Sequence, residues 1–88
     1  MLAKNFLDIL GRSDFRKDGA AFHVGTGVSC SVYLGLGDDA LVIDRVTSLE
    51  VAGEIATIVT MRREHYSVEV SEVRAVRVTP ENSGPGYR

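Results

Sequence analysis

Apolar residues recur at every second position over most of residues 20–78, and this period constrains the fold more than any other feature. In "AAFHVGTGVSCSVYLGLG" the apolar residues occupy even positions, and in "EHYSVEV" Tyr66, Val68 and Val70 keep the same period. A period of two places alternate side chains on opposite faces of a β-strand. We therefore expect antiparallel strands with one face in the core and the other in water.

The period slips once, in "VEVSEVRAV", where the apolar residue after Val70 is Val73 and not residue 72. A continuous strand would bury Glu72 and Arg74 without partners, which costs several kcal/mol for each charge. A short 3₁₀ turn over residues 71–73 avoids this cost, because it brings Val73 inward and leaves Glu72 in solvent. We expect the sheet to resume with Val76 and Val78.

Turn residues divide the first apolar run into hairpins. A loop at residues 25–27 would pair Val24 with Val28 and Phe22 with Cys30. A tight turn at residues 38–39 would then set Leu36 opposite Leu41, Leu34 opposite Ile43, and Tyr33 beside Asp44 on the outer face. The segment "RSDFRKDG" before this run is charged and is expected to be a connecting loop, with Phe15 under it.

The segment "RVTSLEVAGEIATIVTM" fits two structures. Residues 47–50 match a helix capping box, whereas Gly53 and the β-branched residues after it favour a strand. We predict a strand for its second half and leave residues 48–58 open between helix and strand. A turn at residues 63–64 would pair this strand with the next in a hairpin, with these partners: Met61 with Tyr66, Val59 with Val68, and Thr57 with Val70.

The amino-terminal residues have helical spacing. One face of a helix over about residues 2–11 would carry Leu2, Phe6, Ile9 and Leu10, and Gly11 would end it. With 88 residues the chain is expected to form a single domain over residues 1–79, with a flexible tail at 80–88. The fold class is then mostly β (α+β): an antiparallel barrel or roll of five to six strands with one amino-terminal helix.

The segment "YSVEVSEVRAVRV" has the order strand, single turn, strand, and it follows hairpins that all bury the same face. This arrangement resembles the last two strands of SH3-like small barrels. The resemblance covers about residues 20–79, is one of architecture without a family motif, and implies a small barrel. An open antiparallel roll is the alternative. The whole chain also resembles short proteins of proteobacterial genomes, which implies a bacterial source and no particular function.

Composition limits the classes of partner. The formal net charge is −2, whereas domains built to coat nucleic acid carry a basic excess. The amino terminus is not typical of a secretory signal, and no stretch is apolar enough to span a membrane. A single cysteine, Cys30, fits a reducing compartment. We expect a cytoplasmic protein that does not bind a membrane, and we rank nucleic acid below protein as its partner, since a local basic patch stays compatible with the sequence.

Catalytic and metal chemistry lack the residues they require. Cys30 falls on the apolar face and His23 on the opposite one, so they do not form a nucleophile and base. Asp38, Asp39 and Asp44 lack the spacing of a calcium loop. We therefore expect no enzyme activity, no cofactor and no metal.

Two kinds of binding remain. We expect a non-catalytic regulatory module that acts through protein contact, with self-association through Leu2, Phe6, Ile9 and Leu10. The alternative is a small barrel that binds RNA or a cyclic dinucleotide; "RSDFR" has the RxxxR spacing of PilZ domains, but their second motif is misspaced here. The candidate binding residues are Arg62, Arg63, His65, Arg74, Arg77 and Tyr33.

Overall fold

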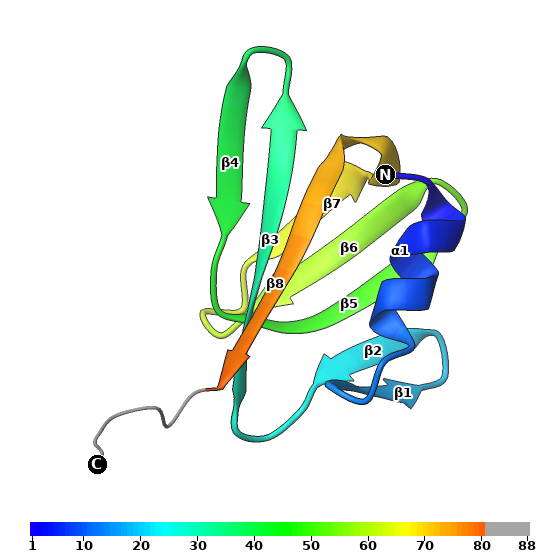
Figure 1. Ribbon diagram of the computed structural model, residues 1–88, viewed down its shortest axis with the longest axis vertical. Coiled ribbons are helices and arrows are strands. Elements are labelled where there is room, and N and C mark those ends of the chain that lie inside the picture. The colour runs from blue at the N-terminus through cyan, green and yellow to red at the C-terminus, as the bar shows by residue number, and fades with distance from the viewer. Residues whose placement is uncertain (81–88) are drawn as a thin grey trace.

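A computed structural model describes residues 1–80 of the chain. Over this range it contains one α-helix, eight β-strands and one 3₁₀ turn (Figure 1). The elements are α1 (Ala3–Leu10), β1 (Phe15–Asp18), β2 (Ala21–Val24), β3 (Val28–Leu36), β4 (Asp39–Ile43), β5 (Val46–Ala52), β6 (Ile55–Thr60), β7 (His65–Glu69), η1 (Val70–Glu72) and β8 (Val73–Pro80).

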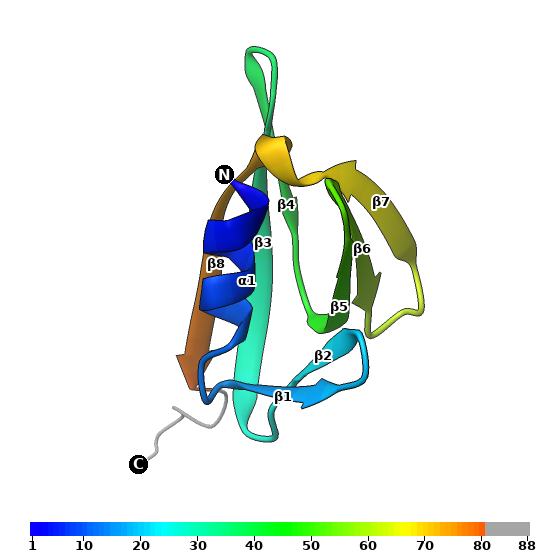
Figure 2. The same cartoon turned by 90° about the vertical axis from the view of Figure 1, so that its right-hand side faces the viewer.

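The strands form two antiparallel sheets. The larger has the order β1-β2-β5-β6-β7 and the smaller the order β4-β3-β8. Over the described residues neither sheet closes into a barrel, and the two are seen side-on in Figure 2. The mostly-β class with one amino-terminal helix is therefore confirmed, and the expected five to six strands are too few.

The chain crosses between the sheets at three short connections. Residues 25–27 lead from β2 to β3, residues 44–45 from β4 to β5, and η1 from β7 to β8. The slip in the apolar period is the third crossing. Val70 and Val73 are both fully buried, and Glu72 between them is half-buried. The expected 3₁₀ turn exists and begins one residue earlier than predicted.

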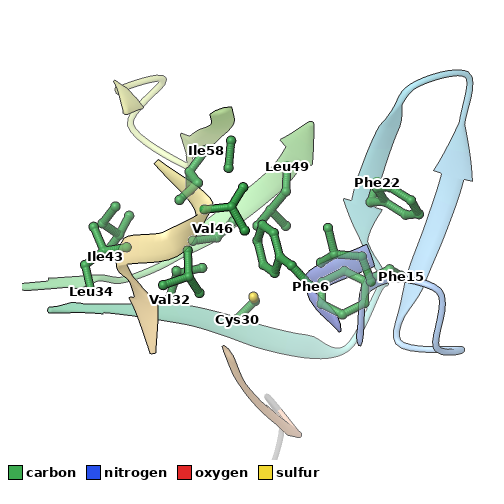
Figure 3. Packing of buried hydrophobic residues seen from close by; sticks show 14 residues of the cluster. Phe6, Phe15, Phe22, Cys30, Val32, Leu34, Ile43, Val46, Leu49 and Ile58 are labelled. Carbon is green, nitrogen blue, oxygen red and sulfur yellow. The ribbon is translucent and has the colours of Figure 1, made fainter. Parts of the chain in front are cut away.

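The core lies between the two sheets, and α1 lies at one end of it with Phe6 directed inward (Figure 3). Inward residues of both sheets meet there. They include Phe22, Leu49 and Ile58 from the larger sheet and Cys30, Val32 and Leu34 from the smaller. Burial of these side chains holds the sheets face to face, since each buried aliphatic or aromatic side chain contributes about 1.5–3 kcal/mol.

The helix α1 matches the predicted segment and places two side chains in this core. Phe6 and Leu10 are fully buried, whereas Leu2 is 70% exposed and Ile9 is half-buried. Gly11 ends the helix and donates its N–H to the carbonyl of Leu7 at 3.0 Å. Because Phe6 and Leu10 pack within their own chain, they are not free to contact a second copy.

The expectation of a loop over "RSDFRKDG" is wrong, because Phe15–Asp18 form β1 and pair with β2. Propensity gave no sign of this strand, since its residues after Phe15 are charged and exposed. Phe15 itself is buried, as expected. Pairing with β2 and burial of this one aromatic ring are what make the segment a strand.

The predicted pairing across residues 25–27 is also wrong. β2 pairs with β1 and β5, and β3 pairs with β4 and β8, so Val24–Val28 and Phe22–Cys30 are not cross-strand partners. Phe22 and Cys30 nevertheless share the core. Alternation places both side chains inward, and it does so equally for one sheet or for two facing sheets.

The hairpin between β3 and β4 forms, but its turn is at residues 37–38 and not 38–39. Leu36 is paired with Asp39, Leu34 with Leu41, and Tyr33 with Val42. Gly37 has a φ of 65°, which suits the first central position of a type II′ turn. Glycine adopts this conformation without strain, so the turn forms one residue closer to the amino terminus than predicted. Each residue of β3 is therefore paired with a β4 residue two positions earlier than expected.

Residues 48–58 contain no helix: they form the end of β5, a turn at residues 53–54 that contains Gly53, and the start of β6. The next hairpin, β6–β7, also forms, but Ile58 pairs with Tyr66 and Thr57 with Ser67, so the predicted partners are wrong. The loop spans residues 61–64, where Glu64 accepts a bond from the Thr60 N–H at 3.0 Å. A longer loop than the assumed tight turn shifts every pair.

At the carboxyl end Pro80 belongs to β8 and is opposite Val28. The predicted flexible tail therefore does not include residue 80. The rest of it, residues 81–88, lies outside the described residues.

Candidate binding surface

The six candidate binding residues fall into two groups on different sheets. Arg62 and Arg63 lie in the β6–β7 loop and His65 begins β7. Arg74, Arg77 and Tyr33 belong to the smaller sheet. Because η1 carries the chain from one sheet to the other between β7 and β8, the structure does not bring these residues into one cluster.

The second group lies on the outer face of the smaller sheet. Tyr33 is half-buried, opposite Val42 on β4 and Ala75 on β8. Arg77 is opposite Ser31, whose hydroxyl donates to Asp44 Oδ1 at 2.7 Å. This face therefore presents the ring of Tyr33, the guanidinium group of Arg77 and the carboxylate of Asp44, which accepts a hydrogen bond from the Ser31 hydroxyl.

Arg74 crosses the same sheet close to its backbone. A Cβ built on Gly35 would lie 2.5 Å from Nε of Arg74. Glycine at this position lets the arginine side chain lie across β3. The position of Arg74 also coincides with the shift of register between Tyr33 and Leu34 in the β3–β8 ladder.

The first group borders a hollow of about 360 Å³ between the end of β4 and the β6–β7 loop. Its lining includes Ile43 and Tyr66, which are apolar or aromatic, and the charged residues Asp44, Arg45, Arg62 and Glu64. Two acidic and two basic side chains give the hollow no excess charge, so it does not have the potential of a phosphate site.

Hydroxyl groups hold the carboxylate of this hollow in place. Glu64 Oε1 accepts hydrogen bonds from Thr60 Oγ1 at 3.4 Å and from the Tyr66 hydroxyl at 3.3 Å. The Glu64 N–H donates in turn to Thr60 Oγ1 at 3.3 Å. The lining of the hollow thus includes a hydrogen-bonded polar group, formed by Thr60, Glu64 and Tyr66, as well as the apolar side chain of Ile43.

A second hollow, of about 560 Å³, lies between residues 24–30 and the segment around Arg45. Cys30 contributes to its lining, yet the residue is fully buried. Desolvation by burial, with a smaller effect from Asp14, raises the pKa of the Cys30 thiol to about 11. His23 belongs to β2 in the larger sheet, and its Nε2 atom is 3.8 Å from Oδ2 of Asp18. Cys30 is therefore a protonated core thiol at neutral pH and a poor nucleophile.

The β3–β4 hairpin projects beyond the rest of the molecule (Figures 1 and 2). Three large apolar side chains are exposed on it, beside the exposed Asp38 and Asp39: Leu36 is 45% exposed, Leu41 41% and Val42 43%. β4 is also an edge strand, since it pairs with β3 alone among the described residues. Exposed apolar side chains beside unpaired backbone groups are typical of a site that accepts another chain.

Sequence reasoning missed this surface. It assigned Leu36 and Leu41 to the core because they continue the even and odd apolar sets of their strands. The signal that could have found it is the glycine-rich turn "GLGDD" beside "ALVI", since a long hairpin extends past a core this small. Periodicity says which face a residue takes, and it does not say how far the core reaches.

Over residues 1–80 no three acidic, histidine or cysteine side chains gather closely enough to hold a metal ion. No helix in that range is long and apolar enough to cross a bilayer. Comparisons of the chain with family models, curated proteins and solved structures found no match.

Proposed function

We propose that this protein is a small non-catalytic binding module that acts through protein–protein contact at the β3–β4 hairpin. The observation that carries the proposal is the combination of exposed Leu36, Leu41 and Val42 with the free edge of β4. Strand addition at such an edge supplies backbone hydrogen bonds for affinity and side-chain contacts for specificity. The likeness of residues 20–79 to SH3-like small barrels belongs to this proposal as an architectural parallel.

RNA or nucleotide binding through Arg62 and Arg63 is the second proposal. Both side chains are exposed at the β6–β7 loop. We rank it second because Asp44 and Glu64 line the same hollow as Arg62, and carboxylates repel phosphate. Arg74 and Arg77 are on the other sheet and do not add to the charge of the loop.

A pull-down with three baits tests the first proposal. The baits are the wild-type chain, a Leu36→Ser/Val42→Ser variant, and a Leu2→Ser variant, each checked for folding by circular dichroism. Leu2 is the matched control, because it is an exposed apolar residue at the N-cap of α1. We expect a protein retained by the wild type and by Leu2→Ser and lost from the hairpin variant.

Three results would count against the hairpin. Loss from the Leu2→Ser bait alone would transfer the interface to the helix face, for which the sequence predicts self-association through Leu2, Phe6, Ile9 and Leu10. Recovery of RNA with the wild type, abolished by nuclease, would favour the second proposal. Equal retention by all three baits would place the contact elsewhere.

A further inference from the structure

We infer that the hollow between the β2–β3 loop and Arg45 binds a free carboxylate with an apolar chain, of the size of a medium-chain fatty acid. The volume of this hollow is about 560 Å³, within the range of about 300–1,000 Å³ typical of small-molecule sites. The inference goes beyond the proposed function, because the ligand is a small molecule and the exposed residues of the hairpin do not line this hollow.

The hollow opens at the end of the core where two connections cross between the sheets. Residues 25–27 enter β3 there, and residues 44–45 enter β5. Cys30 on β3 and Val46 on β5 lie deepest in its lining, since both are buried in the core (Figure 3). The apolar part of the lining consists of Val24, Val28, Cys30, Val46 and Met61. An apolar chain in the hollow would therefore contact side chains of both sheets.

Arg45 is the single charged residue in the lining of this hollow. It also borders the hollow of about 360 Å³, whose lining includes Asp44 and Glu64, but neither of these acids lines the larger hollow. Over residues 1–80 the only ion pair joins His23 and Asp18, so no carboxylate of that range neutralises the guanidinium of Arg45. A guanidinium binds a carboxylate with two parallel hydrogen bonds. One guanidinium also balances the single charge of a carboxylate, whereas a phosphate group carries more.

The backbone holds Arg45 at the rim of the hollow. Its φ is 56°, and Arg63 is the other non-glycine residue with a positive φ over residues 1–80. Residues held in this sparsely populated region concentrate at functional sites. The Arg45 carbonyl accepts the N–H of Met61 at 2.9 Å. This hydrogen bond keeps the charged residue next to an apolar one that is 62% exposed, so the rim offers both kinds of contact.

Asp14 determines which end of the ligand lies outermost. Its carbonyl accepts the N–H of Gly25 at 2.8 Å, which places it beside the loop that lines the hollow. Its charge helps to raise the pKa of Cys30, so it opposes a second negative charge at that depth. A carboxylate beside Cys30 would also lose its water, whereas at the rim it meets both water and Arg45. The chain therefore points toward Cys30 and the carboxylate toward solvent.

A set of matched probes tests the chemistry of the ligand. Octanoate, 1-octanol and octylammonium share one chain and differ in charge, whereas butanoate and hexanoate shorten the chain of octanoate. In NMR titrations of the wild type we expect saturable binding of octanoate, weaker binding of octanol and the weakest binding of octylammonium. Each methylene that enters the hollow should raise the affinity about fourfold. Equal affinities for octanoate and octylammonium, or for butanoate and octanoate, would overturn the inference.

Substitutions at the rim separate the contribution of the charge from that of the apolar contact. Arg45→Gln should lower the affinity for octanoate about tenfold and leave that for octanol unchanged, because it removes the charge. Met61→Ser should lower both affinities, because it removes apolar contact alone. Arg62→Gln is the matched control: it changes the net charge equally, and Arg62 does not line this hollow. All three residues are exposed, and circular dichroism checks that the variants fold. Equal effects of Arg45→Gln and Arg62→Gln would overturn the carboxylate site.

The chemical shifts of the same titrations locate the ligand. We expect the largest changes from octanoate at the backbone amides of residues 26–30 and 45–47, which line the hollow. The exposed apolar residues Leu36, Leu41 and Val42 are the internal control, because an apolar chain that binds without a site would cover them as well. Changes confined to these three residues or to α1 would show adsorption to an exposed surface and would overturn the inferred site.

Failure of this inference can be distinguished from failure of the proposed function. The Leu36→Ser/Val42→Ser variant should bind octanoate as the wild type does, because neither residue lines the hollow. An Arg45→Gln bait should retain the protein that the hairpin captures. A folded wild-type chain that shows no saturable binding of octanoate overturns the inference and leaves the result of the pull-down unchanged.

Discussion

Cys30 illustrates how its neighbours decide the chemistry of a residue. The thiol lies among Phe22, Val32 and Leu34 in the core and is fully buried. Burial disfavours the thiolate, and Asp14 adds a smaller effect in the same direction, so the pKa rises from 9.0 to about 11. The residue with the most reactive side chain in the sequence is therefore one of its inert packing residues.

This pKa predicts a loss of stability in alkali. The folded state holds the thiol proton up to about pH 11, whereas the unfolded chain releases it near pH 9. The contribution of Cys30 is therefore complete below pH 9 and is lost as the pH rises toward 11. Urea unfolding of the wild type should show a fall in the free energy of unfolding across this window.

The Cys30→Val variant is the control. Valine cannot titrate, and it is already among the residues that form the core around Cys30. The difference in pH dependence between the two proteins is the measured quantity, because every other titratable group is common to both. An identical pH dependence of wild type and variant would show that the thiol does not titrate with the predicted shift.

Among the elements, η1 does most to define the fold. It receives the chain from β7 in the larger sheet and delivers it to β8 in the smaller. The N–H of Val70 donates to the Glu54 carbonyl at 2.8 Å, which ties the turn to the β5–β6 hairpin. The terminal amino group of Met1 donates to the carbonyl of Val73 at 3.0 Å, next to the turn.

Substitutions on either side of this turn should differ strongly in effect. Val73→Asp would bury an unpaired charge in the core and is expected to cost several kcal/mol or to prevent folding. Glu72→Ala should change the free energy of unfolding by about 0.5 kcal/mol or less, as substitutions outside the core usually do. Denaturant unfolding of both variants provides the measurement, and equal effects would mean that the inward and outward residues of the turn are misassigned.

At the scale of the whole molecule, the two sides of the core differ in what covers them. α1 and β4 stand on opposite sides of the molecule (Figure 1). On the helix side Phe6 and Leu10 enter the core. On the β4 side the polar hollow remains between β4 and the β6–β7 loop. The proposed function places the protein's contact on this second side.

The charge distribution predicts that the molecule does not bind RNA at physiological salt. Its net charge is −2, and acidic residues adjoin the arginines of the β6–β7 loop. Fluorescence anisotropy with a labelled single-stranded RNA should show no binding under these conditions. Micromolar affinity that falls steeply with salt and is lost in Arg62→Ala/Arg63→Ala would contradict this prediction.

The sequence by itself determined the features that depend on neighbouring residues. The period of two identified the strands after residue 20 except β5, whose segment was left open between helix and strand, and the period of 3.6 identified α1. The slip at Val70 and Val73 located the 3₁₀ turn within one residue. These features are local, because burial of one face requires a fixed spacing along the chain. The core positions of Phe22, Cys30 and Val32 follow from the same spacing.

Only the tertiary structure decided which strands are neighbours. Alternation is satisfied equally by one sheet and by two facing sheets, so the sequence did not show that residues 25–27 cross between sheets. Loop conformation determined the registers of the β3–β4 and β6–β7 hairpins. The turn at Gly37 and the loop at residues 61–64 changed the cross-strand partners, although the predicted and the observed pairings both keep apolar residues on one face. The charged strand β1 exists because it pairs with β2, and the surface at Leu36, Leu41 and Val42 exists because the hairpin is longer than the core beneath it.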